Sequence, residues 1–188
     1  MRAAKSETPL EKIAADFRMW RAQSIPRNKL RDALYLVLIT PGFQVALLLR
    51  IGELLGKVPI VGKLLRRILW YINCLLFGCY IDPEAEIAGG LYLPHPIGIV
   101  IGNEISIGRN VIILQGCTLG RAAGRGSAVG SQGPTVGDEV TIYAGATIIG
   151  AVRMGAGCTV AAGAIVTKDV AAGDVVGGVP ARSLRSGT

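Results

Sequence analysis

An apolar residue recurs every six positions through the second half of the chain, and this period constrains the fold more than any other feature. The period begins at Ile81, breaks once after Cys117 and resumes at Val136. A six-residue period fits neither the 3.6-residue helix nor the simple alternation of a strand. It predicts a hexapeptide solenoid, a parallel β-helix with one short strand and one turn per six residues. The thirteen positions are Ile81, Ile87, Leu93, Ile99, Ile105, Val111, Cys117, Val136, Ile142, Ile148, Met154, Val160 and Val166.

Composition supports this interpretation and sets the expected domain limits. The chain has 26 glycines, which a turn every six residues requires, and its aromatic content of 5% suits a narrow aliphatic interior. We expect the β-helix to occupy residues 80–182. The Gly-rich break in the period predicts a loop at 121–135 that extends from one corner and either borders a binding site or only links two coils. Residues 183–188 are expected to form a C-terminal tail.

Residues 1–79 have a helical pattern instead. Residues 1–27 are expected to form a polar, partly helical arm that could be flexible. The rest is apolar and helical in pattern, interrupted by Pro41-Gly42 and by Val58-Pro59. The longest uncharged run, residues 33–49, is short and broken by Pro41, which disfavours a transmembrane helix.

The basic character of the chain belongs to this N-terminal half. Residues 1–80 carry 13 Lys and Arg against 5 Asp and Glu, whereas residues 81–188 carry 7 against 8. A helix expected at about residues 59–77 is apolar with a basic side. Two interpretations stay open: the helix packs on the end of the repeat or on another subunit, or it lies on an anionic membrane surface.

The four cysteines form no CxxC pair and no zinc-ligand spacing, so we expect free, buried thiols in a reducing compartment and no metal. The N-terminus lacks the early apolar core of a secretory signal. A cytoplasmic protein is therefore expected.

His95 is the only histidine, and it lies inside the repeat between Pro94 and Pro96. Prolines on both sides restrict its backbone, and an imidazole titrates near neutral pH, so His95 is a candidate general base. A structural or merely exposed histidine is the alternative that the residues themselves leave open.

The histidine lies in the stretch Pro94-His95-Pro96-Ile97-Gly98-Ile99-Val100-Ile101-Gly102. This stretch resembles a motif of the serine O-acetyltransferases of the hexapeptide acyltransferase superfamily. Further matches lie at 111–120, 142–150 and 178–182, and upstream at Arg31-Asp32, Gly42-Phe43-Gln44 and Arg50-Ile51-Gly52. The resemblance covers roughly residues 28–182.

This resemblance implies a left-handed β-helix, an exception to the usual right-handed crossover of parallel strands. It further implies a homotrimer, which could pair into a dimer of trimers, with acetyl-CoA in the groove between two subunits. His95 would take the proton of an acceptor hydroxyl as its oxygen attacks the thioester, with no acyl-enzyme and no metal. No nucleic-acid partner is expected.

The resemblance also assigns residues to the donor. Exposed backbone at Ala144, Gly145, Ala162 and Gly163 would pair with the pantetheine arm. Lys168 and Arg182 match positions that hold the nucleotide phosphates and can donate charge-assisted hydrogen bonds. Their alternative is an ordinary solvated surface charge.

The chain departs from the family at residues that recognise serine. The family's Asp before the histidine is Pro94 here, the Asp fifteen residues earlier is Tyr80, and the loop motif is Ser131-Gln132-Gly133-Pro134. Tyr80 and Asp82 become the candidates for orienting His95. The expected acceptor ligands are Asp32, which matches the family, and Arg121 and Arg125 in the loop.

These departures favour a side branch similar to the colanic acid biosynthesis acetyltransferases. We therefore expect O-acetylation of a sugar of a cell-surface polysaccharide, built on a lipid carrier at the inner face of the membrane. The alternatives are a serine O-acetyltransferase of cysteine biosynthesis and a non-catalytic hexapeptide scaffold. A zinc hydratase is disfavoured, because such sites use several histidines and this chain has one.

Overall fold

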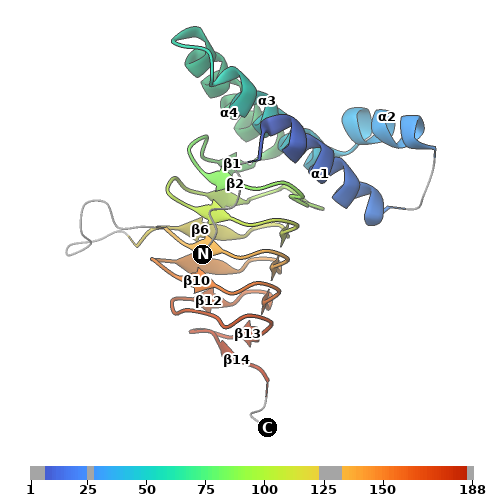
Figure 1. Ribbon diagram of the computed structural model, residues 1–188. Helices are drawn as coiled ribbons and strands as arrows, with labels where there is room; N and C mark the ends of the chain where they lie inside the picture. Colours follow the sequence, from blue (N-terminus) through green and yellow to red (C-terminus); the bar gives the residue numbers. More distant parts are fainter. Residues whose placement is uncertain (1–6, 25–27, 123–132, 186–188) are drawn as a thin grey trace.

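The computed structural model describes residues 7–24, 28–122 and 133–185. The helices lie at one end of a column of short-stranded coils, and the C-terminal strand β14 lies at the other end (Figure 1). The helices are α1 (Pro9–Ala22), α2 (Lys29–Ile39), α3 (Pro41–Leu55) and α4 (Val61–Phe77).

Local sequence signals account for the helix ends. Thr8 and Glu11 form a capping box at the start of α1, and the Asn28 side chain accepts from the backbone of Leu30 at the start of α2. Gly78, in the left-handed conformation, ends α4. In the described ranges no single helix is long and apolar enough to span a membrane, although α2 and α3, bent by 87°, meet that criterion as a pair.

The coils are built from fourteen short strands in three sheets, which form the three sides of the column. The sheet orders are β1-β3-β6-β9-β12, β10-β7-β4-β2 and β14-β13-β11-β8-β5. Named strands pair in parallel except β13 and β14. The bounds are β1 Tyr80–Ile81, β2 Glu86–Ile87, β3 Val100–Ile101, β4 Ser106–Ile107, β5 Ile112–Ile113, β6 Thr118–Gly120, β7 Thr135–Val136, β8 Thr141–Ile142, β9 Thr147–Ile149, β10 Arg153–Met154, β11 Thr159–Val160, β12 Ile165–Val166, β13 Val175–Gly177 and β14 Arg182–Ser183.

The interior of the column confirms the predicted period. All thirteen periodic residues are at most 3% exposed. They belong to one core cluster that also takes in Val45 and Leu49 of α3. The helical end is therefore continuous with the interior of the coils.

The strand register contains a second interruption that the period did not reveal. Val100 pairs with Thr118, eighteen residues on, but Tyr80 pairs with Val100, twenty residues on. The two extra residues lie between Tyr92 and Val100, since Tyr92 bridges to Ile112. Two positions of each six point inward, as the buried Ile99 and Ile101 do. Because the two inward positions are two residues apart, the insertion only moves the six-residue period from one inward position to the other. The period in the sequence therefore continues unbroken across the insertion.

A buried ion pair fixes α1 and α3 to the first coil. Arg50 of α3 is fully buried, and its Nε lies 2.9 Å from Oδ2 of Asp16 in α1. The guanidinium also donates to the carbonyls of Ile87 and Ala88 at 2.8 and 2.7 Å, and Asp16 accepts from the N–H of Gly90 at 2.7 Å. Burial alone would lower the pKa of Arg50, but the carboxylates around it outweigh burial and raise the pKa. The part of the expected arm that forms α1 is thus anchored to the coils.

Candidate active site

His95 lies on the two-residue insertion, at the corner where the chain passes from the bridge at Tyr92 to β3. The His95 carbonyl accepts from the backbone N–H of Ile97 at 2.9 Å, which closes a tight turn. Pro96 is buried and His95 is exposed. The insertion therefore lifts the imidazole off the regular coil and into solvent.

Below His95, one glycine from each of four coils stacks at the same corner. Gly98, Gly116, Gly145 and Gly163 have φ between 66° and 71°, the left-handed region that favours glycine. The N–H groups of the last three donate to the preceding coil at 2.9 Å each. We name these four residues the glycine corner. It contains Gly145 and Gly163, the two glycines predicted to face the donor.

The glycine corner offers backbone donors. In the part of the chain that the structure describes, the amide N–H groups of Gln115, Ala144 and Ala162 have no acceptor. Gln115 and Ala162 are exposed and Ala144 is half-buried. One free donor per coil lies beside each of the last three glycines. An extended ligand with amide carbonyls would fit such a row.

Tyr80 and Asp82, the predicted orienting pair, contact each other. The Tyr80 hydroxyl donates to Asp82 Oδ2 at 3.5 Å, and its ring packs edge-on against Trp70 at 5.3 Å. Burial and the Asp82 carboxylate raise the pKa of Tyr80, so the hydroxyl stays protonated. Among the described residues, no hydrogen bond or ion pair reaches the His95 imidazole. The orienting role stays a prediction.

The three predicted acceptor ligands do not form one cluster. Asp32, buried in α2, pairs with Arg21 Nε at 2.7 Å. Arg121 is exposed and its Nη1 lies 3.4 Å from Glu104 Oε2. Arg125 falls outside the described residues. In a single chain, therefore, Asp32 and Arg121 are paired with protein groups and their acceptor roles stay predictions.

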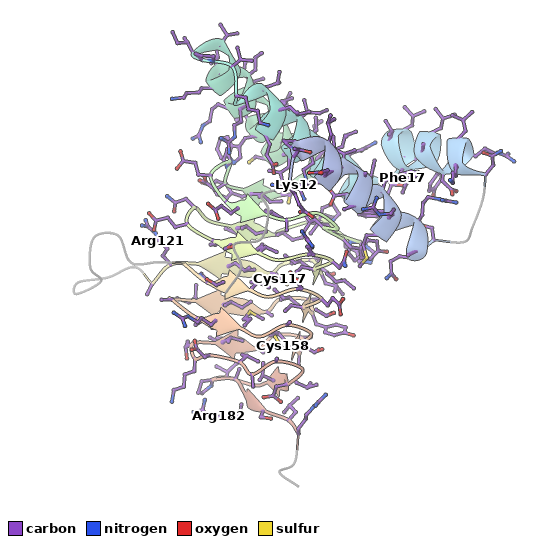
Figure 2. All side chains as sticks on the ribbon, viewed as in Figure 1. Lys12, Phe17, Cys117, Arg121, Cys158 and Arg182 are labelled. Atoms are coloured by element: carbon purple, nitrogen blue, oxygen red, sulfur yellow. The ribbon has the colours of Figure 1, made fainter. Side chains whose placement is uncertain are left out.

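Lys168 and Arg182, predicted to hold phosphates, lie toward the C-terminal end. Lys168 follows β12, and Arg182 begins β14, where it pairs with Gly177. Figure 2 shows Arg182 near the end of the column and Arg121 several coils away. Both predicted phosphate ligands are exposed, as a solvated charge or a phosphate ligand would be.

The helices support the His95 insertion in a way that the sequence analysis missed. The Trp20 indole N–H donates to the carbonyl of Leu91 at 3.1 Å, and its ring lies 4.5 Å from that of Tyr92. A side chain at Gly42 would collide with the Leu93 carbonyl and with Trp20. The start of α3 thus packs directly against Leu93, two residues before His95. Gly42 belonged to a quoted motif, but nothing in the sequence pattern linked Trp20 to the site.

The cysteine thiols lie apart from any cluster of metal-ligating side chains in the described ranges. Burial raises the pKa of Cys79 to about 12 and that of Cys158 to about 11. All four cysteines are free. Across residues 7–24, 28–122 and 133–185, no three His, Cys, Asp or Glu side chains are grouped to hold a metal ion.

The relatives of this chain reported below are named serine acetyltransferase. No family profile matches it. A serine acetyltransferase of Synechococcus elongatus is 33% identical over 178 residues, covering 93% of this chain and 69% of that protein. Serine acetyltransferase of Helicobacter pylori strain J99 is 32% identical over 156 residues, covering 82% and 87%. Against serine acetyltransferase 2 of Arabidopsis thaliana, the match covers 58% of this chain and a smaller share, 33%, of the relative.

The solved structures that resemble this chain are serine acetyltransferases as well. Neisseria gonorrhoeae serine acetyltransferase has a TM-score of 0.81 at 30% identity, covering 96% of this chain and 67% of its own. The same protein in complex with serine gives 0.77 at 32% identity, covering 93% and 68%. A serine acetyltransferase in complex with CoA gives 0.78 at 28% identity, covering 94% and 70%.

These likenesses overturn two expectations. The resemblance to colanic acid acetyltransferases is not supported, and the predicted acetylation of a polysaccharide sugar is wrong, because relatives and structural neighbours alike are serine acetyltransferases. The sugar interpretation rested on charges missing at Pro94, at Tyr80 and in the segment 131–134. Missing charges alone do not identify a new acceptor.

The expected left-handed β-helix behind N-terminal helices is confirmed, since the likeness spans helices and coils together. The expected acyltransferase class is confirmed by the same proteins. With 33% identity to a relative of which it covers 69%, the chain belongs to the serine acetyltransferase family.

Proposed function

We propose that this protein transfers the acetyl group of acetyl-CoA to the hydroxyl of serine. The observation that carries the proposal is the position of His95, the only histidine, lifted from the coil above a column of free backbone donors. Relatives named serine acetyltransferase, and a structural neighbour that holds serine, support the choice of acceptor.

In this reaction the neutral His95 imidazole accepts the hydroxyl proton as the serine oxygen attacks the thioester carbonyl. The tetrahedral intermediate collapses, the carbon–sulfur bond breaks, and the imidazolium returns the proton to the departing CoA thiolate. A positioned general base contributes about 10²- to 10⁴-fold in rate. Exposed N–H groups at the glycine corner are donors of the kind that an oxyanion requires.

The donor would lie along the glycine corner. The free N–H groups of Gln115, Ala144 and Ala162 suit the amide carbonyls of the pantetheine arm. Lys168 and Arg182 would then receive the phosphates beyond the last coil. A structural neighbour in complex with CoA supports CoA as the donor.

We also propose that the protein works as a homotrimer with each site between two subunits. Within one chain the His95 imidazole has no partner among the described residues, and Arg121 lies on a different coil. A groove between subunits would bring such separated groups together. Tyr80 and Asp82 then orient His95, and Arg121 and Arg125 bind the serine carboxylate.

The test measures CoA thiol release by the full-length protein with acetyl-CoA and L-serine, L-threonine or no acceptor. Serine-dependent release is expected, and His95→Ala should lower kcat by about 10²-fold or more. Arg153→Ala, an exposed change on another sheet, is the matched control and should keep full activity. A rate of CoA release that does not depend on serine, or that is unchanged in His95→Ala, contradicts the proposal. Absence of acetyl-CoA binding by calorimetry would favour the scaffold alternative.

A further inference from the structure

Helix α4 presents a long apolar face that nothing in the described chain covers. On one side α4 packs against α3 and buries Gly62 and Asn73. The opposite side exposes aliphatic and aromatic side chains at helical spacing, each at least 38% accessible. These residues, the α4 face, are Val61, Leu64, Leu65, Ile68, Tyr71, Leu75 and Leu76. The helix of 17 residues is about 25 Å long.

The charge around this face has one sign. Between Leu54 and Ile81 the sequence contains four basic residues and no Asp or Glu. Lys63 and Arg67, four residues apart, follow one edge of the face. Neither forms an ion pair with any described residue, and the Arg67 guanidinium lies 3.9 Å over the Trp70 ring.

A cationic hollow lies between α4 and the first coil. Lys63, Arg66 and Arg67 line it from the helix, and Asp82 and Glu84 line it from the turn after β1. Arg66 is half-buried, with its stem against Gly52 and Gly56. Lys63 and Arg67, at the edge of the apolar face, therefore share this hollow with Arg66 on the α3 side and with two carboxylates of the first coil.

The position of α4 leaves the candidate active site accessible. The helices lie at one end of the column and the coils extend away from them to β14 (Figure 1). A flat partner along α4 would touch the helical end, while most of the glycine corner lies farther down the coils.

We propose that the α4 face docks this protein on an anionic phospholipid surface. The aliphatic side chains would enter the boundary between headgroups and acyl chains, and Lys63 and Arg67 at the edge of the face would bind headgroup phosphates. A second copy is the other occupant to consider. Pairing two α4 faces would bring two basic edges together without a carboxylate on either helix to balance them, whereas anionic lipid supplies that charge.

The test is flotation of the full-length protein with vesicles of phosphatidylcholine alone or mixed with phosphatidylglycerol. Co-flotation is expected with the mixed vesicles at low salt, and high salt should weaken it by screening. Lys63→Glu/Arg67→Glu and Leu64→Glu/Ile68→Glu should each lower the bound fraction about tenfold, since each removes one of the two attractions. Arg109→Glu/Arg153→Glu makes the same charge change on the coils and should leave binding unchanged.

Equal binding to both vesicle types, or none to either, would overturn the proposal. It would also fail if Leu64→Glu/Ile68→Glu reduced the assembly mass in light scattering while wild-type protein ignored lipid, because the face would then join copies of the chain. Circular dichroism verifies folding of each variant. Serine acetylation in free solution should be unaffected by Leu64→Glu/Ile68→Glu, whose side chains lie on the exposed face away from Tyr80 and Asp82, so the docking and the enzymatic proposals fail separately.

Discussion

The helical end and the column of coils are held together by different means. The coils stack aliphatic side chains of equal spacing, so that each coil repeats the contacts of its neighbour. The helices have a small second core of Trp20, Leu36 and Phe43. They meet the coils through Val45 and Leu49, which join the coil core, and through the buried Arg50–Asp16 pair, which hydrogen-bonds to the backbone of the first coil. Stability in the coils is therefore spread over many similar contacts, whereas attachment of the helices depends on a few unlike ones.

The largest expected effect separates the two regions. Arg50→Ala leaves the Asp16 carboxylate buried without its partner, and breaking such a pair costs about 3–5 kcal/mol. Urea unfolding followed by tryptophan fluorescence measures the loss, since Trp20 and Trp70 both lie in the helices. The double change Arg50→Met/Asp16→Leu should recover much of it. A loss below about 1 kcal/mol for Arg50→Ala, the level of a surface pair, would show that the ion pair does not hold the helices.

A core truncation in the coils is the matching test. Ile148→Ala, at a fully buried position, should cost about 2–5 kcal/mol, and Ile148→Val about 0.5–1.5 kcal/mol. Because contacts repeat along the column, Ile142→Ala should cost nearly the same. Urea midpoints of the three variants give the comparison. Unequal costs for the two alanine variants would mean that the coils are less uniform than their register suggests.

Gly42→Ala probes the junction between the regions. An added methyl group would push against the Leu93 carbonyl and Trp20, and overpacking of this kind costs about 1–3 kcal/mol. Leu93 precedes the His95 turn by two residues, so kcat for serine should fall more than KM changes. Gly120→Ala, whose methyl would meet only the Ile149 side chain, is the control. Unchanged kcat in Gly42→Ala would show that α3 does not position His95.

Alkaline pH should weaken the core of the coils, to which Cys79 and Cys158 both belong. The Cys79 thiol has a folded pKa raised by burial to about 12 from 9.0, so the unfolded chain loses this proton first. Its stabilising contribution is complete below pH 9 and is lost as pH rises toward 12. Burial raises the pKa of Cys158 to about 11, so its stabilising contribution is lost in the same way as pH rises toward that value. Unfolding free energies at pH 8 and pH 10.5 should differ less in Cys79→Ala and in Cys158→Ala than in the wild type. Parallel pH dependences in all three proteins would contradict this.

The smallest effect concerns the surface. Arg121 and Glu104 form an exposed pair at 3.4 Å, and Arg121→Ala should change stability by about 0–1 kcal/mol. The same variant should raise KM for serine if Arg121 binds the carboxylate. A stability loss without any change in KM would leave Arg121 a structural residue only.

The sequence predicted the coils well, because the six-residue period is local and each apolar residue reports its own burial. It could not show the two-residue shift before Val100, since Ile99 and Ile101 both point inward. The Arg50–Asp16 pair was also out of reach, because its partners lie 34 residues apart and no period connects them. His95 was found because it is the only histidine. Its acceptor was misjudged because missing charges at Pro94 and Tyr80 were taken as evidence for a sugar.

The insertion places His95 outside the regular spacing of the coils that follow it. Coils succeed one another at about 4.8 Å, the spacing of hydrogen-bonded strands, and the three coils with Gly116, Gly145 and Gly163 repeat the same glycine and the same free donor. Below His95, free backbone donors therefore recur at a fixed spacing along the column. If Lys168 and Arg182 hold the donor phosphates as proposed, adding or removing a coil near the C-terminal end would change their distance from His95. The length of acyl donor that fits would change with it, while the position of His95 would not.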